Sequence, residues 1–174
     1  DNHRFDARAV FGLYPAQRTG ADTVSVFDEY GQNVTHTFEH LRQQSDKVTG
    51  KPNLSLADYI KPSAQPEDYL GGFTVSIFGA EELANEYKAK GDDYSAILVQ
   101  SLADRFAEAF AEHLHERIRK EFWGYKADEV LDNEALIKEK YVGIRPAPGY
   151  PACPEHSEKA VLFDWLGSEE KIGT

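Results

Sequence analysis

The segment between Asp92 and Phe122 limits the fold of this chain more than any other part of the sequence. Gly91 precedes it, and Asp92 or Asp93 can cap its first turn. Apolar residues then recur at steps of three and four over about seven turns. They are Tyr94, Ile97, Leu98, Leu102, Phe106, Ala109, Phe110, Leu114, Ile118 and Phe122. The pattern predicts one long helix over residues 92–122.

Strand-like patterns lie in the first half of the chain. The runs expected to form strands cover residues 8–14, 23–29, 33–39 and 73–79. The first run stops at Pro15, and residues 30–32 suit a hairpin turn between the second and third runs. The glycine pair at residues 71–72 is expected to turn the chain into the last strand. Residues 53–66 are expected to form an irregular connection with one short turn at residues 55–60.

Further helices are expected after the strands. They should cover residues 80–90 and 133–141, and a last helix should begin at Pro154 or Glu155 and end near Leu166. Strands that precede helices, without a repeating βαβ order, indicate an α+β fold. The sequence therefore predicts a twisted, mainly antiparallel sheet flanked by helices.

Length, charge and cysteine content narrow the class of function. The 174 residues correspond to one domain, and the absence of methionine indicates a segment of a longer chain. The net charge of −11 argues against binding to a nucleic-acid backbone, which needs clustered cations. No apolar run approaches the roughly 20 residues that a membrane span needs. A single cysteine cannot form an internal disulfide, which favours a reducing, cytoplasmic location.

The segment RPAPGYPACPEHSEK, from Arg145 to Lys159, contains four of the eight prolines of the chain. Proline fixes φ and removes N–H donors, so such a loop loses little entropy when it binds a ligand. Arg145 offers a planar fork for a carboxylate, Tyr150 can cover a flat ring or a cation, and Gly149 permits close approach. The residues suit a small ligand with a carboxylate and a planar ring. They equally suit a stiff linker in which Arg145 forms a salt bridge.

Cys153 and His156 raise two further possibilities. Zinc sites usually need three or four ligands, often in pairs, and here a single Cys-x-x-His stands alone. A cysteine hydrolase with His156 as the base is a second possibility, but nothing in the sequence supplies an oxyanion site. We therefore expect a small packed thiol and an imidazole in the first turn of a helix, with no metal.

An acidic ridge lies on the long helix. Asp104, Glu108 and Glu112 recur every four residues, away from the apolar stripe. The ridge suits a solvated helix face, a docking surface for a partner, or a wall beside a cationic ligand.

Three segments together resemble the activation domain of cobalamin-dependent methionine synthase. They are RPAPGYPACPEHSEK, the helix ILVQSLADRFAEAFAEHLHERIRKEFWGY and the early FGLYPAQRTGADTVSVF. The resemblance spans essentially the whole chain, and it implies a helmet- or C-shaped α+β fold that binds S-adenosylmethionine. In that family the domain caps the cobalamin-binding domain while cob(II)alamin takes up an electron and a methyl group to give methylcobalamin. The electron comes from flavodoxin or a flavoprotein reductase.

The resemblance also assigns residues to the ligand site. These are Arg145, Pro146, Ala147, Gly149, Tyr150, Glu108 and Glu139. Arg145 would hold the methionine carboxylate, and Glu108 and Glu139 would face the ammonium or the sulfonium. Asp104 would contact the cobalamin-binding domain. No residue is given a catalytic role.

Within the family pattern, residues 1–174 correspond to the central part of one S-adenosylmethionine-binding domain, truncated at both ends. The expected protein is a multidomain methyltransferase, and this segment alone is expected not to be catalytic. Cobalamin is expected to bind a neighbouring domain and not this chain. The alternative is a non-catalytic interaction module that docks a partner through the acidic ridge.

Overall fold

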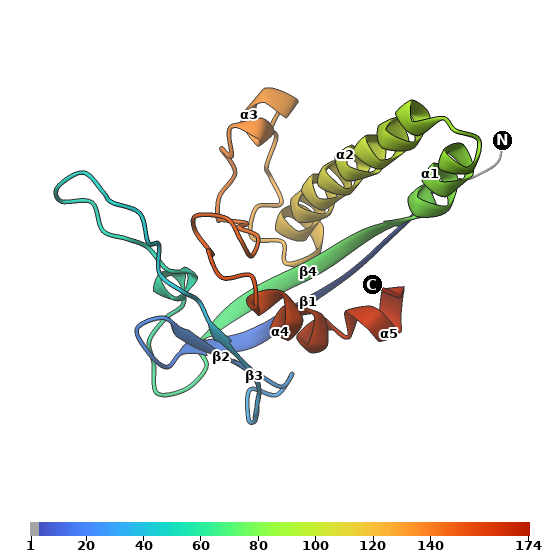
Figure 1. Cartoon of the computed structure of the whole chain (residues 1–174). Helices are drawn as coiled ribbons and strands as arrows, with labels where there is room; N and C mark the ends of the chain where they lie inside the picture. Colours follow the sequence, from blue (N-terminus) through green and yellow to red (C-terminus); the bar gives the residue numbers. More distant parts are fainter. Residues whose placement is uncertain (1–3) are drawn as a thin grey trace. The chain divides into compact units, whose positions relative to one another are not determined.

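Within residues 4–174, which this computed structural model describes, the strands precede the α-helices, and the predicted α+β class is confirmed (Figure 1). The strands are β1 (Asp6–Arg18), β2 (Thr23–Phe27), β3 (Val34–Glu39) and β4 (Asp68–Phe78). They form one sheet in the order β3-β2-β1-β4, and β2 is antiparallel to both of its neighbours.

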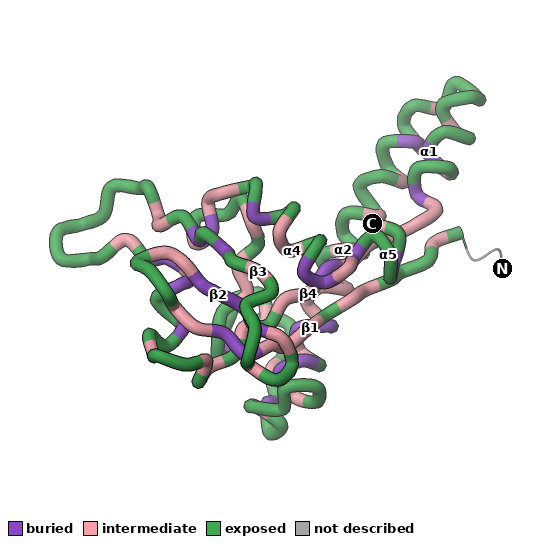
Figure 2. Tube along the Cα trace, turned by 90° about the horizontal axis from the view of Figure 1, so that it is seen from below, coloured by how far each residue is buried: buried purple, intermediate pink, exposed green. Residues whose placement is uncertain are grey.

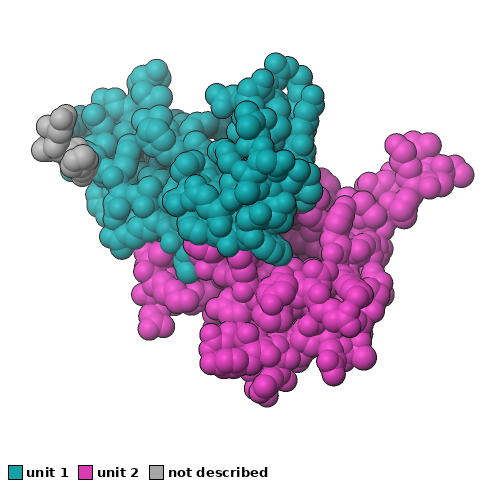
Figure 3. All heavy atoms as spheres, turned by 180° about the vertical axis from the view of Figure 1, so that it is seen from behind, with its two compact units in different colours: residues 1–10, 74–143, 174 teal, residues 11–73, 144–173 magenta. Residues whose placement is uncertain are grey.

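The chain divides into two compact units (Figure 3). Unit 1 contains residues 1–10, 74–143 and 174, and unit 2 contains residues 11–73 and 144–173. β2 and β3 lie in unit 2 alone, whereas β1 and β4 contribute residues to both units. Each unit is therefore assembled from segments that are far apart in the sequence.

The core of unit 2 forms where β2 meets its neighbours. The register pairs Val24 with Phe38 of β3, and Ala16 of β1 with Val26. β2 is buried along nearly its whole length (Figure 2). A cluster of buried side chains joins the strands to η1 (Leu56–Tyr59), the short turn expected at residues 55–60. The members of this cluster are Ala16, Val24, Ala57 and Ile60.

Helix α4 (Glu158–Leu166) packs on β3 within unit 2. The Trp165 ring centroid lies 5.4 Å from that of Phe38 and 5.6 Å from that of Tyr14. A Cβ atom at Gly72 would lie 2.4 Å from the Trp165 ring, so only glycine leaves room for the indole. The prediction of a turn at residues 71–72 is wrong, because both glycines lie inside β4. The missing side chain of Gly72 leaves space for Trp165.

The expected end of the first strand at Pro15 is also wrong. β1 continues through Pro15 to Arg18. Proline lacks the N–H that a strand ladder uses, but the pairing of β1 with β2 begins only at Ala16. Pro15 therefore costs that ladder no hydrogen bond, and the strand does not need to stop.

The long helix of unit 1 is confirmed. It consists of α2 (Asp93–Arg117), which continues as one π-helical turn, η2 (Ile118–Phe122). The Asp92 carboxylate accepts a hydrogen bond from the Ser95 N–H at 3.0 Å, so Asp92 is the N-cap. α1 (Ala80–Ala89) precedes α2 and packs against it.

Much of the apolar stripe of α2 is exposed. The exposed positions are Tyr94, Ile97, Leu98, Leu102 and Phe106, whereas Ala96 and Leu114 are buried.

No helix in the described part of the chain combines the length and the apolar character that a membrane crossing demands.

Replacing the N-cap should weaken α2. In Asp92→Ala the Ser95 N–H loses its acceptor, and we expect the free energy of unfolding to fall measurably. Urea denaturation measures this change. Asp93→Ala is the matched control, because Asp93 stands one residue further on and does not cap the helix. Equal losses in the two variants would contradict the capping role.

The later helices differ from the expected ranges. α3 (Asn133–Ile137) ends before residue 141 because Glu139 adopts a positive φ of +52° and the helix buries no residue. α4 begins at Glu158 because the Glu155 carboxylate accepts from the Ser157 N–H, a local bond that competes with helix formation. α5 (Ser168–Ile172), which follows Gly167, was not expected.

Unit 1 also holds the most deeply buried charge in the described residues. The Arg119 side chain, in the π-helical turn, is 0% exposed. It donates to both oxygens of the Glu129 carboxylate, with distances of 2.6–3.0 Å. Its guanidinium lies 4.4 Å from the Tyr141 ring centroid. His115 Nδ1 lies 2.7 Å from Nη1, and since arginine only donates, Nδ1 is the acceptor.

Candidate ligand-binding site

The residues assigned to ligand binding, and Asp104, assigned to contact with the cobalamin-binding domain, are divided between the two units. Arg145, Pro146, Ala147, Gly149 and Tyr150 lie together in unit 2, on the loop that leads into α4. The three acidic residues lie in unit 1. These are Asp104, Glu108 and Glu139.

A closed turn shapes the loop. The Tyr150 N–H donates to the Ala147 carbonyl at 3.1 Å. The Gly149 N–H donates to the Cys153 carbonyl at 2.7 Å, and the Cys153 N–H donates to the Tyr150 carbonyl at 2.9 Å. These bonds satisfy backbone groups inside the loop itself, so the turn has a defined shape without help from a sheet.

Gly149 has no substitute in this turn. Its φ is +100°, a conformation that residues with a side chain rarely adopt. A Cβ atom there would lie 2.2 Å from Cε1 of His156, because the imidazole packs directly over the glycine. His156 thus lies beside the turn, as a packing partner of Gly149.

The side chains of the loop differ in their exposure. Tyr150 is 63% exposed, so its ring is available to a ligand. Arg145 and Pro146 are half-buried, and Ala147 and Gly149 are exposed. The exposed Tyr150 ring, the exposed backbone and the half-buried residue Arg145 belong to the same loop, and such groups can bind a molecule that carries a flat ring and a carboxylate.

Cys153 closes the turn and is buried, at 2% exposure. Burial raises the pKa of its thiol to about 11, and the nearby Glu158 and Glu155 carboxylates act in the same direction. A nucleophilic cysteine needs a lowered pKa, so the thiol has the character of a packed side chain. In the described residues, no group of three or more His, Cys, Asp or Glu side chains could hold a metal ion.

The sequence analysis did not identify two buried polar residues, Glu158 and His40. Glu158, at 6% exposure, accepts a hydrogen bond from the Glu39 backbone N–H at 3.0 Å. Its other oxygen lies 3.6 Å from Nδ1 of the buried His40. An acidic residue in the first turn of a helix usually remains in solvent, so no local signal marks Glu158 as buried.

The acidic residues of unit 1 are largely in solvent. Asp104 and Glu108 are exposed, and Glu108 accepts from Arg105 at 2.8 Å. The ridge is less continuous than its spacing suggests, because Glu112 is only partly exposed. Glu139 is exposed as well, and its positive φ sets it apart from the other non-glycine residues that the structure describes.

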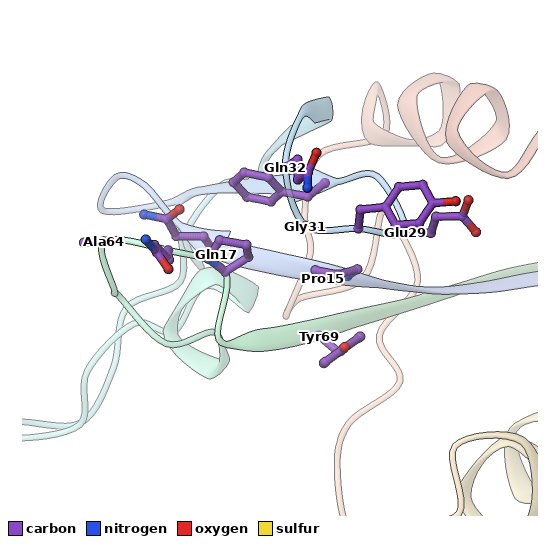
Figure 4. A pocket seen from close by; sticks show the side chains of 11 residues that line it. Pro15, Gln17, Glu29, Gly31, Gln32, Ala64 and Tyr69 are labelled. Atoms are coloured by element: carbon purple, nitrogen blue, oxygen red, sulfur yellow. The ribbon is translucent and has the colours of Figure 1, made fainter.

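A hollow of about 560 Å³ opens in unit 2, between the turn after β2 and the start of β4 (Figure 4). Pro15 and Gln17 of β1 line it, with Gly31 and Gln32 from the turn and Tyr69 from β4. A second hollow of about 340 Å³ is lined by Asp22, Glu39, Leu41 and Glu155. Residues 145–150 line neither of these two hollows of the described chain.

Comparison with known proteins gives two findings. A family model described as "Vitamin B12 dependent methionine synthase, activation domain" matches residues 1–174. A crystal structure of the MetH reactivation domain bound to AdoHcy matches with 48% sequence identity and a TM-score of 0.87. That match covers 96% of this chain and 52% of the other, so this chain spans about half the length of the matched structure.

Proposed function

Because this chain belongs to the family of activation domains of vitamin B12-dependent methionine synthase, we propose that it binds S-adenosylmethionine through residues 145–150. The similarity to a reactivation domain described as bound to AdoHcy carries this proposal. AdoHcy is the molecule that remains when S-adenosylmethionine gives up its methyl group. The two share the carboxylate, the ammonium and the adenosyl group that a binding site would recognise.

The loop has groups for each part of this ligand. The Arg145 guanidinium would pair with the carboxylate in a planar, charge-assisted contact. The exposed Tyr150 ring would cover the adenine or the sulfonium. The turn already uses the Ala147 carbonyl and the Gly149 N–H. Contacts from the backbone of Pro146, Ala147 and Gly149 would therefore come from the remaining groups, such as the Ala147 N–H and the Gly149 carbonyl.

The acidic residues of unit 1 also have proposed roles. Glu108 and Glu139 would face the ammonium or sulfonium charge of the ligand. Asp104 would contact the cobalamin-binding domain.

The chain would act as one domain of a larger cytoplasmic methyltransferase. The reaction it supports is reductive methylation, in which cob(II)alamin gains one electron and the methyl group of S-adenosylmethionine to give methylcobalamin. The partners would be the cobalamin-binding domain of the same enzyme and flavodoxin or a flavoprotein reductase. Methyl transfer to a reduced cobalt centre removes no proton, so the chain needs no general base and alone would not be catalytic.

Removing the guanidinium should weaken ligand binding. In Arg145→Ala we expect the affinity for S-adenosylmethionine to fall by about 1.5–3 kcal/mol, roughly 10- to 150-fold, because a charge-assisted hydrogen bond is lost. Isothermal titration of the full chain measures it. Arg4→Ala is the control, since Arg4 forms a half-exposed ion pair with Glu86 in unit 1. Unchanged affinity in Arg145→Ala would reject the assigned role.

A further inference from the structure

The start of α4 is held to the sheet by an unusual contact. Ser157 stands at the N-cap but forms no capping hydrogen bond with its side chain. The carboxylate of the next residue, Glu158, does not cap the helix either. It accepts a hydrogen bond from the Glu39 N–H, 119 positions away in the sequence. A hydrogen bond to a buried carboxylate stabilises more than one between neutral groups, so this contact fixes the first turn of α4 against the end of β3.

The contact lies next to the proposed ligand loop. Only four residues separate Glu158 from Cys153, whose backbone forms two hydrogen bonds that close the turn at Gly149 and Tyr150. Pro154 lies between them and limits the freedom of this short connection. A shift of Glu158 would therefore move Cys153 and open the turn.

We propose that Glu158 is a positioning residue, which holds the loop of residues 145–153 in its ligand-binding shape through the hydrogen bond to Glu39. The inference rests on the proposed S-adenosylmethionine site. Glu158 itself is buried and would not touch the ligand. Its effect would pass through the backbone of Cys153.

The surroundings of Glu158 indicate what a substitute must do. Burial raises the pKa of Glu158, and burial lowers the pKa of His40 to about 4, so His40 is neutral near pH 7. A glutamine amide can accept from the Glu39 N–H with its oxygen, as the carboxylate does. Glu158→Gln therefore preserves the contact, whereas Glu158→Ala removes it.

Cys153 gives a local readout of the loop, since it is buried and is the single cysteine of the chain. We expect Glu158→Ala to bind S-adenosylmethionine about tenfold or more weakly, the size expected for a lost hydrogen bond to a charged group. Iodoacetamide should alkylate Cys153 at least about tenfold faster under native conditions, by the same free-energy difference. In Glu158→Gln both quantities should stay within about threefold of the parent.

Alkylation could become faster because the thiol is more exposed or because its pKa is lower. A matched control distinguishes these two causes. Both Glu155 and Glu158 raise the thiol pKa, but only Glu158 bonds to Glu39. Glu155→Gln therefore reports how much the loss of one nearby charge accelerates alkylation. We expect that acceleration to be much smaller than in Glu158→Ala.

The two readouts distinguish this inference from the proposed function. A parent chain without affinity for S-adenosylmethionine would reject the function, while alkylation would still test the loop. Alkylation at the parent rate in Glu158→Ala, or equal acceleration in the alanine and glutamine variants, overturns the inference. If Glu158→Ala does not fold, Glu158→Asp takes its place: its carboxylate is one methylene too short to reach Glu39. Alkylation of Cys153 at the parent rate in Glu158→Asp would also overturn the inference.

Discussion

Arg119→Ala is expected to lower the free energy of unfolding by about 3–5 kcal/mol, the largest loss we predict for this chain. The substitution leaves the Glu129 carboxylate, 9% exposed, without its bidentate partner. It also removes the donor to His115 and the cation over the Tyr141 ring. A buried charge without compensation costs far more than a surface pair contributes. Chemical denaturation followed by circular dichroism measures the loss.

Arg117→Ala is the matched control, because Arg117 lies two residues earlier and pairs with Glu121 near the surface. We expect it to cost much less than Arg119→Ala, because an exposed ion pair contributes little to stability. The double variant Arg119→Met with Glu129→Met should recover much of the loss, since replacement of both partners removes the unpaired charge. A loss below about 1 kcal/mol in Arg119→Ala would contradict the structural role of the pair.

Gly149→Ala is expected to reduce the affinity for S-adenosylmethionine by about 100-fold, which corresponds to about 2.7 kcal/mol. Two physical effects add up. The residue has a φ of +100°, where alanine is strained by about 1–3 kcal/mol, and the new methyl group would collide with the His156 ring. The backbone can escape only by a change of the turn that carries Tyr150. Isothermal titration of the full chain measures the affinity.

Gly50→Ala is the control that distinguishes backbone strain from the collision with the His156 ring. Gly50 lies in the same unit with a φ of +87°, but a Cβ atom there would meet nothing within 4 Å. We expect Gly50→Ala to lose some stability and no affinity. The double variant Gly149→Ala with His156→Ala removes the collision and should regain part of the binding. Parent-like affinity in Gly149→Ala would show that the ligand does not use this turn.

Several features could be predicted because they depend on neighbours in the sequence. The period of the apolar residues predicted the long helix, and Asp92 stood where a cap was expected. The alternation around residues 30–32 predicted the hairpin of β2 and β3. The Pro-rich segment that begins at Arg145 pointed to the family, and the α+β fold class expected for that family was correct. Helix periods, caps and turns all arise from interactions within a few positions, which a single sequence displays.

Two of the errors concern features that distant residues decide. β1 crosses Pro15 because its pairing with β2 starts one residue later, and β4 includes Gly72 because Trp165 of α4 fills the space above it. The sequence also gives no sign that the first turn of α4 is held by β3.

By itself the sequence determined the α+β class, the long capped helix and a proline-braced loop typical of one family of activation domains. Only the tertiary structure decided which charges are buried. Arg119 meets Glu129 and Glu158 meets Glu39 at separations of 10 and 119 residues. The cost of burying a charge depends on the partner that compensates it, and that partner is known only once the chain has folded.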